Sequence, residues 1–157
     1  MRENETEILL VEDDPLDVEI ALNALRGEQI VNRIHVARDG EEALDFLFCR
    51  NQYENRSFTF PPRLVLLDLK LPKVDGLEVL SHIKADPRTQ AIPVVLLTSS
   101  KEESDIVSGY KLGVNSYIQK PVDFEQFRHV VKDTGLYWLL VNQVPPAGAR
   151  GKAESIP

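Results

Sequence analysis

Four short apolar runs, each followed at once by polar side chains, constrain the fold of this chain more than any other feature. The runs occupy residues 8–11, 64–67, 94–97 and, more weakly, 116–118. Their β-branched and leucine-rich composition and their short length indicate strands that are buried on both faces of a sheet. A further short strand is expected at about 33–37.

Segments with helical spacing separate these strands. We expect helices from Pro15 to near Gly27, after Asp39, over about 77–85, over about 102–112, and from near Asp123. Proline can open a helix without losing a hydrogen bond, and Asp39 suits an N-cap. Strand and helix thus alternate five times. This predicts an α/β fold with a doubly wound, five-stranded parallel sheet of order 2-1-3-4-5 and five helices, as in flavodoxin-like proteins.

The chain is predicted to form one domain over residues 1–144. A polar connection over 50–62 is longer than a helix-to-strand turn requires. The last helix either ends at Gly135 or continues to about Asn142, and the spacing of its apolar residues favours continuation. Residues 145–157 are rich in proline and small polar residues, so we predict a mobile tail there.

Composition excludes several classes of protein. The net charge of −7 argues against binding to nucleic acid, which needs clustered lysine and arginine. No apolar stretch is long enough to cross a bilayer, and the first residues lack the apolar core of a signal peptide. The single cysteine, Cys49, rules out an internal disulfide framework. We therefore expect a cytoplasmic protein with no nucleic-acid or membrane partner.

Acidic residues follow the first and second of the four runs. Glu12, Asp13 and Asp14 come after residues 8–11, and Asp68 comes after 64–67. In a sheet of order 2-1-3-4-5 these two strands are neighbours, and their carboxyl ends meet at the switch point where ligands bind. Converging carboxylates repel each other unless a cation is present, and a set of oxygen ligands favours Mg²⁺. An acidic triplet alone would rather indicate a helix N-terminus, but Asp68 at the adjacent strand end favours the metal site.

A carboxylate at a strand tip can also act as a nucleophile toward phosphorus. Asp68 is the candidate, and this chemistry depends mainly on neutralising the charge of the phosphoryl group. Lys120 follows the last run and can supply a cation, while Thr98 follows 94–97 and can donate its hydroxyl. The alternatives are that Lys120 is a solvated surface lysine and that Thr98 hydrogen-bonds the backbone of a local turn.

The motifs VEDDP (11–15), LLDLKLPKVDG (66–76), LLTSS (96–100) and SYIQKP (116–121) together resemble the receiver domains of two-component response regulators. The resemblance covers residues 6–133, and the joint set is specific although each motif alone is weak. It implies that Asp68 accepts a phosphoryl group from the phosphohistidine of a histidine kinase. It also implies that Asp13, Asp68 and the Lys70 carbonyl bind Mg²⁺, with Glu12 holding a metal-bound water and Asp14 having no ligand role.

The same resemblance implies a switch. Lys120 would bind a phosphoryl oxygen, Thr98 would move toward the phosphoryl group, and Tyr117 would turn inward, changing the surface formed by residues 102–131. From spacing alone, Tyr117 is more simply a half-buried strand aromatic. We further predict that Lys70 and Ser100, two positions beyond Asp68 and Thr98, tune hydrolysis of the acyl phosphate.

The long 50–62 connection, the ending DTGLYWLLVNQVPP (133–146) and the lack of an output domain resemble the small stand-alone regulators paired with cyanobacterial bacteriophytochrome-type sensor kinases. This narrower resemblance implies a phytochrome-type kinase partner, a homodimer and a separate downstream protein. Apolar and aromatic side chains that could form such a surface are Ile106, Tyr110, Leu112, Phe127, Tyr137 and Trp138, although packing on the sheet is an equal alternative for each.

Three rival functions fit the sequence less well. A flavin or nucleotide enzyme needs small residues with free N–H groups after the first strand, whereas this chain has Glu-Asp-Asp-Pro. A phosphatase that forms an aspartyl intermediate needs a second acid two residues after the nucleophile, where Lys70 stands. A receiver-like interaction module without phosphorylation would lack the acceptor, the acid pair or the lysine. We therefore expect a phosphorylation-activated switch that catalyses only its own phosphorylation and hydrolysis and is no enzyme toward external substrates.

Overall fold

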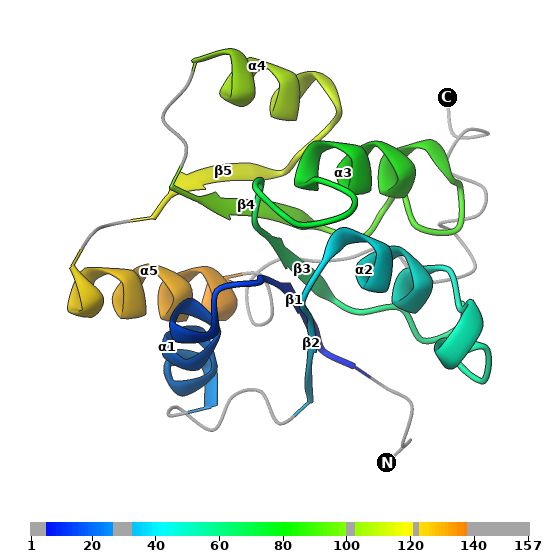
Figure 1. Cartoon of the computed structure of the whole chain (residues 1–157), viewed down its shortest axis with the longest axis horizontal. Coiled ribbons are helices and arrows are strands. Elements are labelled where there is room, and N and C mark those ends of the chain that lie inside the picture. Colours follow the sequence, from blue (N-terminus) through cyan, green and yellow to red (C-terminus); the bar gives the residue numbers. More distant parts are fainter. Residues whose placement is uncertain (1–5, 27–32, 100–102, 121–122, 138–157) are drawn as a thin grey trace.

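A computed structural model describes residues 6–26, 33–99, 103–120 and 123–137 of the chain (Figure 1). The strands are β1 (Ile8–Val11), β2 (Ile34–Ala37), β3 (Leu64–Leu67), β4 (Val94–Thr98) and β5 (Ser116–Gln119). They form one sheet of order β2-β1-β3-β4-β5, and every neighbouring pair is parallel. The predicted fold class and strand order are confirmed.

The helices are α1 (Pro15–Arg26), α2 (Gly40–Leu47), α3 (Gly76–Ala85), α4 (Glu103–Lys111) and α5 (Phe124–Leu136). In Figure 1, α1 and α5 lie side by side on one face of the sheet, and α2 and α3 lie on the other. The strands supply both cores because successive side chains point to opposite faces. In β1, Leu9 and Val11 pack toward α2 and α3, whereas Ile8 and Leu10 pack toward α1 and α5. Of the described helices, none is long and apolar enough to span a membrane.

The helix boundaries follow from local chemistry. Pro15 is the first residue of α1, as predicted. Asp39 caps α2 by accepting a hydrogen bond from the Glu42 N–H, and Asp123 caps α5 in the same way. Helix α5 continues through Gly135, so the prediction of continuation is correct up to Leu136. A Cβ added to Gly135 would lie 2.6 Å from Leu25 Cδ2, which shows that α1 and α5 approach closely there.

Two predictions on the C-terminal part concern residues without a structural description. Trp138 and the continuation of the last helix to about Asn142 lie outside the described residues. The tail over 145–157 lies there as well. The boundary of the domain at residue 144 and the mobility of the tail therefore stay predictions.

The long connection after α2 has its own structure. It begins with a short 3-10 helix, η1 (Asn51–Tyr53). The Tyr53 hydroxyl donates a hydrogen bond to Glu42 Oε2 at 2.6 Å and lies 2.9 Å from His35 Nε2. The Arg56 guanidinium lies 3.6 Å from the centre of the Phe46 ring and donates to the Phe46 carbonyl. The connection is therefore fixed against β2 and α2, although its sequence has no regular periodicity.

Two glycines let helices α2 and α3 start close to the loop that follows β3. A Cβ on Gly76 would overlap the carbonyl oxygen of Asp68, and the Gly76 N–H donates to the Leu69 carbonyl at 2.8 Å. A Cβ on Gly40 would overlap the Val74 carbonyl oxygen in the same loop. Larger residues at either position would displace the backbone next to Asp68.

Candidate functional site

The backbone of the sheet places Glu12 and Asp68 beside each other. Val11 of β1 pairs with Leu67 of β3, and the two acids are the next residue on each strand. The Asp68 N–H donates to the Val11 carbonyl at 3.0 Å, and the Glu12 N–H donates to the Ala37 carbonyl at 3.0 Å. Both acids are therefore held by the sheet at its carboxyl edge, the position that the sequence predicted.

Glu12, Asp13 and Asp68 converge on one point. Each offers one carboxylate oxygen, and these oxygens lie within 4.8 Å of one another. Glu12 and Asp68 are only 4% and 8% exposed, whereas Asp13 is exposed. The three carboxylates form an oxygen-only donor set that opens to solvent on the Asp13 side, and such a set fits a hard divalent cation.

The electrostatics of this cluster also favour a cation. Burial, followed by repulsion from the Asp68 carboxylate, raises the pKa of Glu12 to about 8. Without a metal, the protein therefore resists carrying all these negative charges together. Asp14 is not a member of this set, and its side chain accepts a hydrogen bond from the Leu16 N–H at 2.9 Å, in the first turn of α1.

Lys120 is directed into the acidic cluster rather than into solvent. The backbone N–H of Lys120 donates to the Thr98 carbonyl at 2.7 Å, which continues the pairing of β5 with β4. Its side chain is 9% exposed, and Nζ contacts Glu12 Oε1 and lies 3.3 Å from Asp68 Oδ2. The alternative of a solvated surface lysine is therefore wrong.

A third carboxylate, Asp17, contacts the same ammonium. The distance from Lys120 Nζ to Asp17 Oδ2 is 2.8 Å, shorter than the distance to Asp68. Burial alone would lower the pKa of Lys120. Its hydrogen bonds to Asp17 and Glu12 and its attraction to Asp68 outweigh that effect and raise the pKa above the ordinary value.

Sequence reasoning missed Asp17 because it considered only residues that directly follow a strand. Asp17 lies in the first turn of α1, where an acid is ordinarily explained by the helix dipole. The available signal was geometric. A helix that begins a few residues after a strand keeps its first turn beside the strand's carboxyl end, so an acid there can reach the same site.

Thr98 and Tyr117 lie on the two strands that separate α4 from the acidic cluster. Thr98 ends β4 and is fully buried. Tyr117 pairs with Leu96, is half-buried, and packs against the core that faces α2 and α3. A Cβ added to Gly109 of α4 would lie 3.6 Å from Tyr117 Cδ2, so the ring stands beside α4. These positions agree with the alternative of a half-buried strand aromatic.

Lys70 lies next to the candidate acceptor through its backbone. Its N–H donates to Asp68 Oδ1 at 3.4 Å, and the residue is exposed. Ser100, the other residue predicted to tune hydrolysis, lies outside the described part of the chain.

The predicted surface residues divide into exposed and buried ones. Tyr110 and Tyr137 are 54% and 50% exposed, whereas Ile106 and Leu112 are half-buried. Phe127 is 4% exposed, and its ring centre lies 5.8 Å from Lys120 Nζ. Phe127 therefore belongs to the wall of the candidate site and not to an outer surface.

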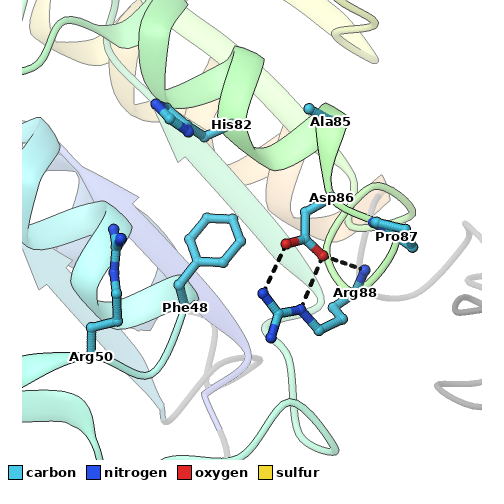
Figure 2. Close-up of a pocket in the computed structure, with 7 residues that line it drawn as sticks. All are labelled: Phe48, Arg50, His82, Ala85, Asp86, Pro87 and Arg88. Atoms are coloured by element: carbon cyan, nitrogen blue, oxygen red, sulfur yellow. Dashed lines mark hydrogen bonds and ion pairs between the residues drawn. The ribbon is translucent and has the colours of Figure 1, made fainter.

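A separate cavity lies away from the acidic cluster, at the C-terminal ends of α2 and α3 (Figure 2). It has a volume of about 580 Å³ and is lined by Phe48, Arg50, His82, Ala85, Asp86, Pro87 and Arg88. Figure 2 shows the Arg88 guanidinium paired with Asp86, at 2.8 Å between Nη2 and Oδ2. A much smaller cavity, of about 10 Å³, is lined by residues that include Glu12, Asp17 and Asp68. The converging charged groups, and not the volume of the cavity, identify the candidate site.

The fold and the site define a class of protein: a doubly wound α/β domain with an acidic cation site and a buried lysine at the carboxyl edge of its sheet. The model of the response regulator receiver domain matches residues 8–132, and the chain belongs to this family.

Individual proteins of this family show which of its members the chain resembles. The chain is 45% identical to the probable methanogenesis regulatory protein FilR2 of Methanothrix harundinacea, covering 88% of this chain and 86% of that protein. It is 39% identical to the response regulator Rcp1 of Synechocystis, covering 89% and 93%. A crystal structure of Rcp1 in its Mn²⁺-bound form superposes with a TM-score of 0.82, covering 88% of this chain and 97% of that one.

The phosphorylated cyanobacterial phytochrome response regulator RcpA is 40% identical in sequence to this chain. Its crystal structure superposes with a TM-score of 0.84, covering 90% of this chain and 99% of that one. These likenesses confirm both the receiver family and the narrower resemblance to stand-alone, phytochrome-associated regulators. The chain is a receiver-domain response regulator.

Proposed function

We propose that this chain is a phosphorylation-dependent switch that accepts a phosphoryl group on Asp68 from a sensor histidine kinase, with Mg²⁺ as cofactor. The observation that carries the proposal is the surroundings of the Asp68 carboxylate. One of its oxygens lies 3.3 Å from the buried ammonium of Lys120. The carboxylate also lies beside those of Glu12 and Asp13, at the edge of the sheet where Asp13 is exposed to solvent. A nucleophile, a cation and a metal ligand set are thus combined at one strand tip.

The reaction is a transfer between two phosphate carriers. An oxygen of the Asp68 carboxylate attacks the phosphorus of a phosphohistidine, a phosphorus–oxygen bond forms, and the phosphorus–nitrogen bond breaks. The imidazole leaves with its electron pair, and the product on this chain is an acyl phosphate. Water later attacks the phosphorus, the bond between the phosphorus and the Asp68 oxygen breaks, inorganic phosphate leaves, and the carboxylate is restored. These steps involve no external substrate beyond the phosphodonor, so we infer that the chain is not an enzyme in the ordinary sense.

Asp13, Asp68 and the backbone carbonyl of Lys70 would hold the metal, with Glu12 binding a water of its shell. The ion would supply positive charge that offsets the charge of the transferring phosphoryl group. The residues of this chain fit that role because their donor atoms are carboxylate oxygens, and because Asp13 faces solvent where an ion can enter. The Mn²⁺-bound form of Rcp1 supports a divalent ion in this family, and Mg²⁺ is the ion we propose here.

Lys120 and Thr98 would receive the new phosphoryl group. Phosphorylation adds roughly −1.5 to −2 charges at Asp68. Lys120 already contacts this carboxylate and can bind a phosphoryl oxygen with little movement. We propose that Thr98 turns toward the group and that Tyr117 moves into the space beside α4 that this opens. The surface formed by α4, β5 and α5 would change as a result.

Likeness to RcpA supports a phytochrome-type kinase as the partner of this chain. A homodimer is proposed from the resemblance to the stand-alone regulators. The surface of α4 offers apolar side chains for such contacts, since Val107 and Tyr110 are 44% and 54% exposed. The downstream protein is identified only by its role, as a partner that distinguishes the two states of this surface.

The phosphoacceptor is tested by intact mass. After incubation with acetyl phosphate and Mg²⁺, the wild-type chain should gain the mass of one phosphoryl group, and Asp68→Asn should gain none, because an amide lacks the nucleophilic oxygen pair. Asp14→Asn is the matched control, since the Asp14 side chain is not a member of the oxygen cluster and accepts a hydrogen bond from the Leu16 N–H, and this variant should be phosphorylated like the wild type. A wild-type chain whose mass stays unchanged with acetyl phosphate and with a cognate kinase would defeat the proposal.

A further inference from the structure

We infer that Asp17 is a positioning residue that draws the Lys120 ammonium away from Asp68 and so keeps the Asp68 carboxylate available to a divalent cation. The inference deepens the proposed function and rests on its metal site. It starts from one comparison of distances. Lys120 Nζ lies 2.8 Å from Asp17 Oδ2 and 3.3 Å from Asp68 Oδ2.

The ammonium and a metal ion would compete for the same carboxylates. Lys120 Nζ contacts Glu12 and Asp68, and these two residues are also members of the oxygen cluster that fits a cation. A carboxylate that is fully paired with an ammonium attracts a metal ion less strongly, because part of its charge is already neutralised. The position of Lys120 therefore controls how much negative charge remains for the metal.

Asp17 is placed to limit this competition. It comes from α1, whereas Glu12 and Asp68 come from the ends of β1 and β3. Asp17 is not a member of the candidate metal-ligand group, and the hydrogen bond that it accepts from Lys120 Nζ connects it to the cluster. The side chain of Asp17 is 23% exposed, more than the side chains of the more deeply buried Glu12 and Asp68, and Asp17 holds the ammonium toward the α1 side of the cluster.

An ordinary explanation of Asp17 is the favourable interaction of an acid with the N-terminus of α1. That interaction requires no contact with Lys120 and predicts no effect on metal binding. The two explanations therefore differ in a measurable quantity, the dissociation constant of the metal.

The experiment is calorimetric titration of the full chain with MnCl₂, in the absence of any phosphodonor. Asp17→Asn should weaken Mn²⁺ binding by about ten-fold, the lower end of what loss of an outer-shell partner costs. Asp17→Glu restores the charge and should recover most of the affinity. Glu19→Gln removes the same charge from an exposed position on α1 and should leave the affinity unchanged. Circular dichroism at the titration temperature confirms that each variant is folded.

A double-mutant cycle with Lys120→Met separates a route through the ammonium from a direct effect of charge. Asp17→Asn should lose most of its effect when Lys120 is absent. An equal effect in both backgrounds, or no effect of Asp17→Asn in the wild type, overturns the inference. If Lys120→Met does not fold, failure of Asp17→Glu to recover affinity overturns it instead. A wild-type chain that binds no Mn²⁺ removes the metal site itself, and both the proposed function and this inference then fail.

Discussion

At the scale of single residues, the chemistry of the site depends on a surplus of acid around one lysine. Glu12, Asp17 and Asp68 all contact Lys120 Nζ, and Asp13 lies with Glu12 and Asp68 in the oxygen cluster that could hold a metal ion. Three of these four acids, Glu12, Asp13 and Asp68, lie within two residues of a strand end, and the rule that carboxyl ends of parallel strands share one edge predicted them from the sequence. The rule could not predict Asp17, because Asp17 reaches Lys120 only through the packing of helix α1 against the sheet.

Lys70 and Ser100 carry the prediction on phosphate lifetime. The Lys70 backbone lies beside Asp68, so its exposed side chain can influence the water that attacks the acyl phosphate. We expect that replacing both residues, as Lys70→Ala with Ser100→Ala, changes the rate of dephosphorylation after removal of acetyl phosphate. The rate is measured by the loss of the phosphoryl mass with time. Lys73→Ala is the control, since Lys73 lies in the same loop and is directed to Asp39 at 3.7 Å. An unchanged rate in the double variant would refute the prediction.

At the scale of elements, a helix or strand could be predicted from the sequence when residues within that segment determine its structure. The strands and α1, α2, α3 and α5 follow from apolar spacing and capping residues, and their predicted starts agree with the structure within a residue or two. The 3-10 helix η1 was not predicted. It is held by Tyr53, whose partners Glu42 and His35 are 11 and 18 residues away in the sequence, and no periodic pattern encodes such contacts.

This anchor of the long connection should respond to acid. Burial, aided by the Arg56 charge, lowers the pKa of His35 below its ordinary 6.5, against the opposing effect of Glu42. The unfolded chain therefore takes up the proton first as the pH falls. The stability contributed by neutral His35 is complete above pH 6.5 and is lost as the pH falls through the pKa of the folded state.

We expect the wild type to lose more stability than His35→Gln between pH 7.5 and pH 5.5, by no more than about 1.4 kcal/mol for each pH unit. Urea unfolding at the two pH values measures the difference. His82→Gln is the control, because His82 is 54% exposed on the surface of α3. Equal losses in the wild type and in His35→Gln would contradict the prediction.

At the scale of the whole molecule, the metal site should couple to folding. The acidic cluster exists only when β1 and β3 are paired, so a cation that binds it stabilises the folded chain over the unfolded one. We expect Mg²⁺ at about 100 times its dissociation constant to raise the free energy of unfolding by roughly 2.7 kcal/mol relative to EDTA. Thermal unfolding measures this shift.

Asp13→Asn is the variant that separates this effect from a general response to salt. Asp13 is exposed and contributes a ligand oxygen, so its replacement should remove most of the stabilisation by Mg²⁺ with little harm to the fold. A shift of the same size in Asp13→Asn would show that Mg²⁺ acts elsewhere on the acidic surface.

The exposed Asp13 side of the acidic cluster affects how this protein can choose its donor. The cavity of about 10 Å³ that Glu12 and Asp68 help to line is too small to enclose a donor molecule, so a donor would approach from the solvent. Small donors and the exposed phosphoimidazole of a large protein can approach the same rim. Discrimination among kinases must then come from helices and loops that surround the rim, so residues far from the chemistry can redirect the signal while the reacting groups stay unchanged.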